Sequence, residues 1–250
     1  MVGLSLLKKR VIISLLLNDG ELYRTKQFVP DYQYTQNFVT VDSIDELFII
    51  DITRGGRSEK FTRYVKAIID KCFVPITVGG HFRTIEDIQW ALGEFGADCI
   101  LMGTAASNAE LISEVAHKFG SQLLTVACDY RIEHGRSQTY TRQGQMPQFY
   151  TAPDWARMAE DFGAGQIFLQ SIDRDGSLEG YDLEILREVS DAVNIPVVVG
   201  GGCGRWEHMR DAWDAHASGS VTTNIFHFTE TTISSWKQKL QEAGVPVRVE

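Results

Sequence analysis

Short apolar runs rich in β-branched residues alternate with amphipathic stretches along the whole chain. The predicted strands occupy residues 10–17, 46–52, 74–78, 99–102, 122–128, 166–171, 195–199 and 220–223. Nearly continuous apolar strands separated by helices indicate a parallel sheet that is buried on both faces. Eight such units in 250 residues fit a closed (β/α)₈ TIM barrel, which typically has about 250 residues, better than an open sheet. We therefore expect residues 1–250 to form a single domain of the α/β class.

Helix-capping signals stand between these runs. Thr84 precedes an acidic first turn, which favours a helix N-terminus, and Gly96 is placed to end that helix in a left-handed conformation. Asn108 and Gly120 bracket the next amphipathic stretch in the same way. These stretches are therefore predicted as helices on the exterior of the barrel.

The chain also repeats itself. Residues 74–80, VPITVGG, match residues 195–201, IPVVVGG, at an offset of 121, since 195 − 74 = 121. The same offset places Asp51 on Ile172 and Gly55 on Gly176. We interpret the barrel as two similar half-barrels, with strands one to four repeated as strands five to eight. Each half is then expected to carry a copy of any site built at its strand ends.

The composition argues against several classes of function. A net charge of -9 and a pI of about 5.2 make non-specific binding of nucleic acid unfavourable. The four cysteines form no C-x-x-C pair and have no histidine at zinc spacing, so we expect a reducing cytoplasm, no metal site and no cofactor. The apolar and basic residues at the N-terminus stand in the reverse order of a signal peptide, and no apolar run is long enough for a bilayer.

Glycines at the predicted strand ends are the clearest chemical signal. A glycine lets backbone N–H groups approach a ligand closely, and a following helix N-terminus attracts an anion. The candidates for phosphate binding are Gly176, Gly201, Gly202, Thr223 and Asn224 in the second half, and Gly79, Gly80, Gly103 and Thr104 in the first. Two such sites at one mouth suggest a substrate with a phosphate at each end. The alternative is that the glycines only make tight turns, and His81 would crowd the first-half loop.

Three aspartates that follow predicted strands are candidates for general acid/base catalysis. Asp129 ends a wholly apolar strand, where partial burial can tune the pKa of its carboxyl group. The alternative for Asp129 is a capping role or a salt bridge with Arg131. Asp51 and Asp173 occupy similar positions, but they could instead hydrogen-bond the loops.

The long segment after the first strand is predicted to be a lid. It carries charged and aromatic side chains, among them Arg24 and Phe28. Long loops in compact domains often cover an active site. The alternative is an ordinary surface loop around a short first helix.

Ten short motifs point to one family. They are KRVII at 9–13, DG at 19–20, DEL at 45–47, DIT at 51–53, VGG at 78–80, FGSQ at 119–122, SIDRDG at 171–176, GYD at 180–182, EH at 207–208 and FHF at 226–228. In these motifs the chain resembles the HisF family, the cyclase subunits of imidazole glycerol phosphate synthase. The resemblance extends from about Lys8 to the end of the chain, and residues 171–182 are its most specific part.

The resemblance implies a partner and a reaction. HisF takes ammonia from a glutaminase subunit, HisH, which docks on the N-terminal face of the barrel. The ammonia crosses the barrel interior and attacks a ribulosyl-linked aminoimidazole carboxamide substrate that carries two phosphates. Two aspartates, which end strands one and five, act as the acid/base pair. The implied partners of this chain are therefore a HisH-like glutaminase and a phosphorylated small molecule.

The chain departs from this pattern at the substrate-binding end. The strand-five aspartate is present as Asp129, but Leu16 stands at the strand-one position. The loss of one positioned acid/base group typically costs about 10²–10⁴-fold in rate. At the phosphate positions His81 stands for a glycine, Gly103 for an asparagine, and residues 223–224 for a small-residue pair.

The N-terminal end of the barrel departs as well. Family members surround the ammonia entrance with an arginine, two glutamates and a lysine. The corresponding gate residues here are Arg10, Glu46, Gln166 and Cys99. One positive and one negative charge are lost together, which suggests a re-tuned gate. Asp98 and Gln122 keep the character expected at the partner interface.

Three functions are compatible with these residues. The first is a diverged HisF-like subunit that channels ammonia without standard cyclisation, similar to paralogues that supply ammonia for amidination of an acetamido sugar in surface-polysaccharide (lipopolysaccharide O-antigen) pathways. The second is a working cyclase subunit of histidine biosynthesis, in which Asp51 or Asp19 substitutes at the Leu16 position. The third is a non-catalytic subunit that stabilises or activates the glutaminase. Neighbouring genes for histidine or for sugar nucleotides would separate the first two.

Overall fold

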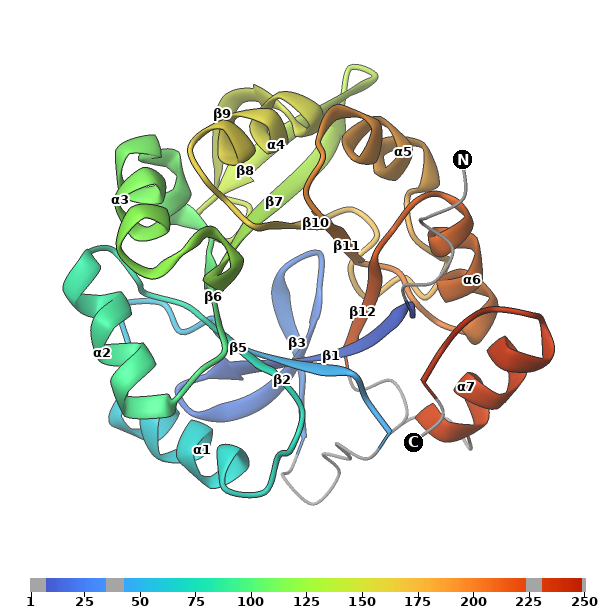
Figure 1. The fold of residues 1–250 in the computed structure, drawn as a ribbon, viewed down its shortest axis with the longest axis horizontal. Helices are drawn as coiled ribbons and strands as arrows, with labels where there is room; N and C mark the ends of the chain where they lie inside the picture. The colour runs from blue at the N-terminus through green and yellow to red at the C-terminus, as the bar shows by residue number, and fades with distance from the viewer. Residues whose placement is uncertain (1–7, 35–42, 224–230, 249–250) are drawn as a thin grey trace.

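Eight parallel strands close into a barrel in the computed structural model, which describes residues 8–34, 43–223 and 231–248 (Figure 1). The barrel strands are β1 (Arg10–Asn18), β4 (Glu46–Asp51), β5 (Ile76–Gly79), β6 (Cys99–Met102), β7 (Leu124–Glu133), β10 (Gln166–Ser171), β11 (Val197–Gly200) and β12 (Gly219–Thr223). Each strand pairs with the next in this order, and β12 pairs with β1 to close the ring. The predicted (β/α)₈ class is therefore confirmed.

Helices surround the barrel on its outside (Figure 1). They are α1 (Glu59–Ile69), α2 (Ile85–Phe95), α3 (Ala109–Phe119), α4 (Ala152–Asp161), α5 (Leu183–Ala192), α6 (Trp206–Asp214) and α7 (Ile233–Glu242), with short 3₁₀ turns η2 (Thr104–Ser107) and η3 (Ser121–Leu123). The predicted caps are confirmed. Thr84 and Asp87 form a capping box at α2, and Gly96 ends that helix with a φ of 58°. Asn108 caps α3 by accepting a hydrogen bond from the N–H of Leu111.

Two antiparallel hairpins rise from the C-terminal end of the barrel. The first consists of β2 (Glu21–Lys26) and β3 (Val29–Tyr34) and extends β1. It occupies the segment predicted to be a lid, where residues 21–34 form strands and not the short helix of the alternative. The second consists of β8 (Arg136–Thr141) and β9 (Met146–Thr151) and continues β7. The sequence reasoning missed this second hairpin, although the His-Gly turn at residues 134–135 was a signal for it.

The two half-barrels correspond in strand register, but not at a single sequence offset. Ile50 pairs with Gly79 between β4 and β5, and Gln170 pairs with Gly200 between β10 and β11. The glycines differ by 121 residues, since 200 − 79 = 121, whereas their partners differ by 120, since 170 − 50 = 120. The residues of β4 and β10 therefore correspond at an offset of 120 and not at the offset of 121 that relates β5 to β11.

This displacement corrects the predicted equivalence of Asp51 and Ile172. Asp51 follows Ile50 on β4, and Ser171 follows Gln170 on β10, so Ser171 is the counterpart of Asp51. A shift of one residue along a strand turns a side chain to the opposite face. On β4 and β10, the ungapped offset would therefore have matched residues that face the barrel interior with residues that face the helices.

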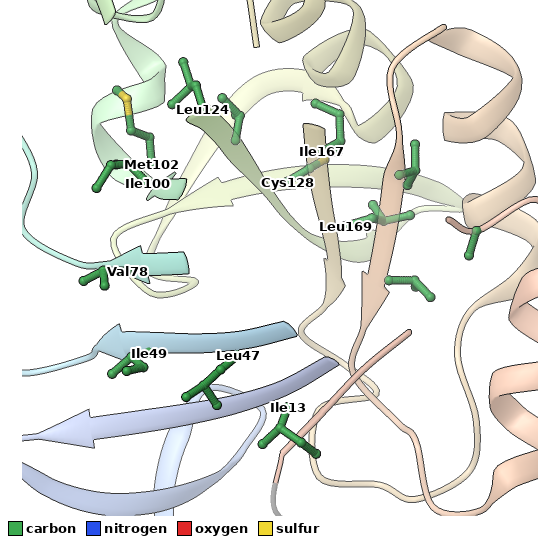
Figure 2. Packing of buried hydrophobic residues seen from close by; sticks show 14 of the residues in the cluster. Ile13, Leu47, Ile49, Val78, Ile100, Met102, Leu124, Cys128, Ile167 and Leu169 are labelled. Atoms are coloured by element: carbon green, nitrogen blue, oxygen red, sulfur yellow. The ribbon is translucent and has the colours of Figure 1, made fainter. Parts of the chain in front are cut away.

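Alternation along the strands creates two apolar cores. Side chains that point outward pack against the helices in the larger core, part of which is shown in Figure 2. Side chains that point inward form a layer across the barrel, namely Ile12, Phe48, Leu101, Ala127, Phe168, Val198 and Val221. The rings of Phe48 and Phe168 meet edge to face with 5.3 Å between their centroids. The barrel interior is therefore packed, as this fold requires.

A buried ion pair fastens α7 to the N-terminal end of the barrel. Lys237 Nζ lies 2.7 Å from Asp45 Oδ1, and the two side chains are 1% and 9% exposed. The other oxygen of Asp45 accepts a hydrogen bond from the N–H of Val11 at 2.8 Å. Asp45 thus links the last helix to β1, and each of its oxygens has a donor.

Replacement of Lys237 tests this link. Lys237→Met should lower the free energy of unfolding by about 3–5 kcal/mol at neutral pH, because the Asp45 carboxylate stays buried without its counter-ion. Urea unfolding measures the change. The control is Lys60→Met, which breaks an exposed pair with Asp19 whose side chains are 59% and 60% exposed. We expect less than about 1 kcal/mol there, and equal effects of the two variants would contradict the role of the buried pair.

Candidate functional site

A large cavity opens at the C-terminal end of the barrel. Its volume is about 1360 Å³, and the strand ends, the tip of the β2–β3 hairpin and the β8–β9 turn line it. The predicted site residues that share it are Leu16, Phe28, Asp51, Gly80, Gly103, Thr104 and Asp129, together with His81. The structure thus brings together the groups that the sequence reasoning selected in the first half of the chain and Asp129, which lies within β7 because that strand continues to Glu133.

Asp129 lies in the wall of the cavity on an inward-facing position of β7. Burial raises the pKa of its carboxyl group to about 7, and the negative charge of Asp175 adds to the shift. The alternative partner Arg131 lies instead against Asp173. A carboxyl group with a pKa near neutrality can donate or accept a proton at physiological pH. The position of Asp129 therefore suits the predicted acid/base role.

Leu16 holds the equivalent position in the first half. Leu16 on β1 pairs with Ile50 on β4, and Asp129 on β7 pairs with Gln170 on β10. Because Ile50 and Gln170 are counterparts in the two halves, Leu16 and Asp129 are counterparts too. Leu16 is buried and lines the cavity beside other apolar side chains such as Leu101. A hydrocarbon side chain cannot exchange a proton. The cavity therefore has a carboxyl group at one of these two equivalent positions and none at the other.

Asp51 is buried at the end of β4, where it faces His81. Its Oδ1 accepts a hydrogen bond from the N–H of Thr53 at 3.0 Å, and its Oδ2 lies 3.7 Å from Nε2 of His81. Burial raises the pKa of Asp51, whereas the bonds from Thr53 and the charges of His81 and Arg57 oppose that shift. Asp51 therefore belongs to the cavity through its contact with His81.

Asp173 lies outside the cavity lining. Its Oδ2 accepts a hydrogen bond from the N–H of Ile132 at 2.9 Å, and its Oδ1 lies 3.4 Å from Nη1 of Arg131. These contacts fasten the loop after β10 to the end of β7. The structure thus favours the loop-bonding alternative for Asp173 over the catalytic one.

The carboxylate that the sequence reasoning missed is Asp175. It is buried, and its Oδ2 accepts hydrogen bonds from Thr25 Oγ1 at 2.6 Å and from the N–H of Phe28 at 3.0 Å. Its carbonyl oxygen accepts a third bond from the N–H of Gln27 at 3.1 Å. These bonds hold the tip of the β2–β3 hairpin against the loop after β10. The partners are 150 residues apart in sequence, and no local pattern announces such a contact.

The glycine site of the second half is nearly filled. A pocket of about 30 Å³ remains there, lined by Ser14, Arg24, Asp175, Gly176, Gly201, Gly202 and Thr223, among others. Gly202 has a φ of 102°, and a Cβ atom on it would lie 2.3 Å from the carbonyl oxygen of Gly180, so only glycine fits. The hairpin also passes close to Gly176, whose Cβ would lie 2.7 Å from the carbonyl oxygen of Thr25. Asn224, predicted beside Thr223, lies outside the described residues.

The candidates of the first half lie along the rim of the large cavity. Gly80 has a φ of 110°, and a Cβ atom there would lie 2.6 Å from the carbonyl oxygen of Asp51. Gly79 ends β5 just below it. The hydroxyl oxygen of Thr104 accepts a hydrogen bond from the N–H of Arg142 at 2.9 Å, which ties the rim to the β8–β9 turn. Phosphate binding by the glycines of either half stays a prediction.

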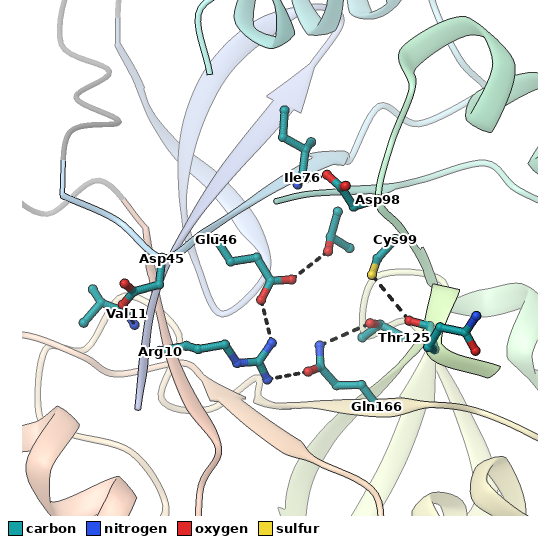
Figure 3. A network of polar contacts seen from close by, with 11 residues as sticks. Arg10, Val11, Asp45, Glu46, Ile76, Asp98, Cys99, Thr125 and Gln166 are labelled. Carbon is teal, nitrogen blue, oxygen red and sulfur yellow. Dashed lines mark hydrogen bonds and ion pairs between the residues drawn. The ribbon is translucent and has the colours of Figure 1, made fainter. Parts of the chain in front are cut away.

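A polar ring closes the N-terminal end of the barrel (Figure 3). Arg10 Nη1 lies 2.7 Å from Glu46 Oε2, and Arg10 Nη2 donates a hydrogen bond to Gln166 Oε1 at 2.5 Å. Gln166 donates in turn to Thr125, and Thr77 donates to the other oxygen of Glu46. Burial raises the pKa of Glu46, and the charge of Arg10 opposes this. Three of the four predicted gate residues are therefore joined by direct hydrogen bonds.

Cys99, the fourth gate residue, borders this ring as a neutral thiol. Its Sγ lies 3.6 Å from the carbonyl oxygen of Gln122. Burial raises the pKa of the thiol to about 11, and the charges of Glu46 and Asp98 add to the shift. Asp98 accepts a hydrogen bond from the N–H of Ile76 at 2.8 Å and so holds the start of β5. Asp98 and Gln122 are both exposed at this end, where the partner interface was predicted.

The described residues place limits on other kinds of site. Among them, no group of three or more His, Cys, Asp or Glu side chains could hold a metal ion. Residues 8–34, 43–223 and 231–248 also include no helix with the length and apolar character needed to cross a membrane. The four cysteines are unpaired thiols.

Comparison with known proteins gives a consistent result. Residues 11–232 match a family model described as histidine biosynthesis protein. The chain is also similar to the imidazole glycerol phosphate synthase subunit HisF of Chlorobaculum tepidum, with 38% identity over 252 aligned residues. The alignment covers 98% of this chain and 100% of that relative. The similarity therefore includes both halves of the barrel.

The raised pKa of Asp129 predicts how Asp129→Asn changes stability with pH. The unfolded carboxyl group ionises near about pH 4, whereas the folded one keeps its proton up to about pH 7. Between these values the folded state binds more protons than the unfolded state, so rising pH destabilises the wild-type protein. The loss is up to about 1.4 kcal/mol per pH unit. We expect the variant to gain on the order of 2 kcal/mol over wild type between about pH 4.5 and pH 7.5.

The free energy of unfolding, measured in urea across this range, checks the prediction. The difference between variant and wild type isolates Asp129, because all other titrating groups are common to both proteins. Asp19→Asn is the control, since the Asp19 side chain is 60% exposed. A difference for Asp129→Asn that stays constant with pH would show that its carboxyl group is not desolvated.

Proposed function

Because the chain belongs to the histidine biosynthesis protein family and is similar to HisF along its whole length, we propose that it is the barrel subunit of a glutamine amidotransferase complex of the imidazole glycerol phosphate synthase type. In this proposal it accepts ammonia from a HisH-like glutaminase and passes it through the barrel. The observation that carries the proposal is the arrangement along the barrel axis. A polar ring lies at one end, an apolar layer in the middle and a large cavity at the other end.

The glutaminase is proposed to dock on the N-terminal face, around the ring. The loops that lead into β5 and β10 lie at this face, and each exposes an aromatic side chain. Phe73 is 98% exposed and Phe162 is 40% exposed. Exposed aromatic residues are common anchors of protein interfaces. With Asp98 and Gln122 they provide apolar and polar contacts beside the entrance.

Ammonia is proposed to cross the barrel as the neutral molecule. Arg10 closes the ring by its bonds to Glu46 and Gln166, so passage requires Arg10 to release at least one of them. The apolar layer beyond contains the contact between Phe48 and Phe168. An ammonium ion would lose its hydration there at high cost, whereas neutral ammonia has no charge to desolvate. The layer therefore selects ammonia over ammonium.

The ligand of the cavity is proposed to be a phosphorylated small molecule. The glycines of the second half offer backbone N–H groups, and Arg24 of the lid offers a guanidinium group beside them. The bonds of Asp175 to Thr25 and Phe28 hold the lid over this end. Entry of a phosphate here therefore requires those bonds to open.

We further propose that the chain has diverged from standard cyclisation. Leu16 removes one of the two acid/base groups that the resemblance implies, and His81, Cys99 and Gln166 alter the rim and the ring. The delivered ammonia would then serve another acceptor. The paralogues that the chain resembles point to amidination of an acetamido sugar in a surface-polysaccharide pathway, carried out by a third protein.

The second candidate is an active cyclase subunit of histidine biosynthesis. Two observations favour it. The named relative, a HisF subunit, is similar over its full length. Asp129 is also in place with a pKa of about 7, and Asp51 lies at the same cavity and could take over from the missing carboxylate.

Phe73→Asp tests the docking face. It should weaken binding of a HisH-type glutaminase from the same organism by about tenfold or more, as expected for loss of an aromatic anchor. Titration calorimetry with the purified subunits measures the dissociation constant. The matched control is Phe149→Asp, because Phe149 is also fully exposed but lies on β9 at the other end of the barrel. No complex with the unmodified chain at micromolar concentration would contradict the proposed partner.

Turnover with excess ammonium salt separates the two candidates. Ammonium bypasses the glutaminase, so the assay reports the chemistry of the barrel alone. We expect turnover of the doubly phosphorylated ribulosyl aminoimidazole carboxamide to be on the order of 10²–10⁴-fold below that of a relative with both aspartates. Leu16→Asp should raise the rate, and Leu16→Asn, which has a similar shape but no acid, should not. Ordinary rates for the unmodified chain would instead support the active cyclase.

A further inference from the structure

The floor of the large cavity lies directly above the apolar layer of the barrel. Ile50, Asp129 and Gln170 each follow a layer residue of the same strand by two positions, so they face the same way as the layer. Leu16 joins them, because it pairs with Ile50 between β1 and β4, as Asp129 pairs with Gln170 between β7 and β10. All four side chains line the cavity, and we call them the floor.

The two halves of the barrel give this floor two unlike sides. Its first-half side is apolar, since Leu16, Ile50 and, from the layer, Leu101 line the cavity there. Its second-half side is polar, because Asp129 and Gln170 stand at the positions that correspond to Leu16 and Ile50. The same positions of one barrel thus carry hydrocarbon in one half and hydrogen-bonding groups in the other, so the fold itself requires neither choice.

The side chain of Gln170 lies between two pockets without a protein partner. It lines both the large cavity and the small glycine pocket of the second half, and Phe168 is the other residue that the two pockets share. The side-chain hydrogen bonds among residues 8–34, 43–223 and 231–248 do not include its amide group, although Gln170 is partly buried. A buried amide without a partner costs free energy, so water or a ligand must satisfy it.

Asp129 presents a second group of the same kind beside Gln170. Its carboxyl group accepts no hydrogen bond from the described parts of the chain, and burial raises its pKa to about 7. At mildly acidic pH it therefore keeps its proton and both donates and accepts hydrogen bonds, as the amide of Gln170 does. The two residues are in register on adjacent parallel strands, which lie about 5 Å apart. Together they form one hydrogen-bonding edge along the second-half side of the floor.

We propose that the floor binds an uncharged, amide-like group of the ligand that has a hydrogen-bonding edge and an apolar back. Asp129 and Gln170 hold the edge, and Leu16 and Ile50 pack against the back. Gln170 and Leu16 are then specificity-determining residues, and Leu16 supplies an apolar contact in addition to removing an acid. The inference rests on the proposed function in taking this cavity as the ligand site, and it deepens that function by naming the chemistry of the ligand next to the layer.

Caprolactam is the probe, because its ring has an N–H beside a C=O on one edge and a hydrocarbon back. N-methylcaprolactam is the matched probe, since its methyl group blocks the donor and leaves the back unchanged. Binding to the full chain is measured by titration of the methyl NMR signals of its Leu, Ile and Val residues at about pH 6, where the Asp129 carboxyl group keeps its proton. The test variants are Gln170→Leu and Leu16→Asn. The control is Gln145→Leu, because Gln145 lines the same cavity at its exposed rim.

We expect the unmodified chain to bind caprolactam about tenfold more tightly than N-methylcaprolactam, as for hydrogen bonds in an enclosed site. Caprolactam should shift the methyl signals of Leu16, Ile50 and Leu101 first. Gln170→Leu should reduce the preference between the probes to about threefold or less. Leu16→Asn should weaken binding of both probes by about fourfold or more, as for the loss of apolar contact worth one methylene. Gln145→Leu should change neither quantity.

The comparison of the two probes on the unmodified chain needs no variant, so it decides the matter even where a variant fails to fold. No binding, equal binding of the two probes, or shifts confined to methyl groups outside the cavity would overturn the proposal. So would a preference that Gln170→Leu and Gln145→Leu leave alike. The titration needs no glutaminase, phosphate or turnover, so its failure is distinct from a failure of the docking and turnover tests of the proposed function.

Discussion

The alternation of side chains along closed, parallel strands is the constraint on which both ends of this barrel depend. β1 shows it over seven residues, because Arg10 lies in the polar ring, Ile12 in the apolar layer and Leu16 in the cavity. Each strand is paired on both sides, so a slip of one residue would turn its inward side chains toward the helices. The ring, the layer and the cavity are thus three levels of one pattern that is repeated around the barrel.

Buried polar groups are treated differently at the two ends. In the ring, Arg10, Glu46 and Gln166 satisfy one another directly, and the result is a closed, charge-balanced plug. In the cavity, burial raises the pKa values of Asp129 and Asp51. The pKa of Asp129, about 7, lets its carboxyl group exchange a proton near neutral pH. The N-terminal end is therefore closed by polar contacts, whereas the C-terminal end is an open cavity with buried carboxyl groups.

The two half-barrels carry different side chains at corresponding positions. The second half keeps Asp129 on β7 and its glycine run beside the β2–β3 hairpin, which Asp175 fastens. The first half has Leu16 at the equivalent strand position and His81 at the equivalent glycine position. The second half thus has a carboxyl group with a raised pKa and a run of glycines at the mouth, and the first half has an apolar side chain and a histidine beside a buried aspartate.

The sequence by itself determined the eight strands, the caps at Thr84 and Asn108, and the gathering of strand-end residues such as Asp129 at one mouth. These features depend on local periodicity and on neighbours within four residues, which are visible in a single sequence. The family motifs added the resemblance to HisF and the partner and reaction that it implies. Only the tertiary structure decided the one-residue displacement between the halves, the β8–β9 hairpin, the Asp175 contacts with the β2–β3 hairpin and the pairing of His81 with Asp51. Each of these joins segments through closure of the barrel, and the energy of such a contact depends on burial and geometry that do not exist before the barrel has closed.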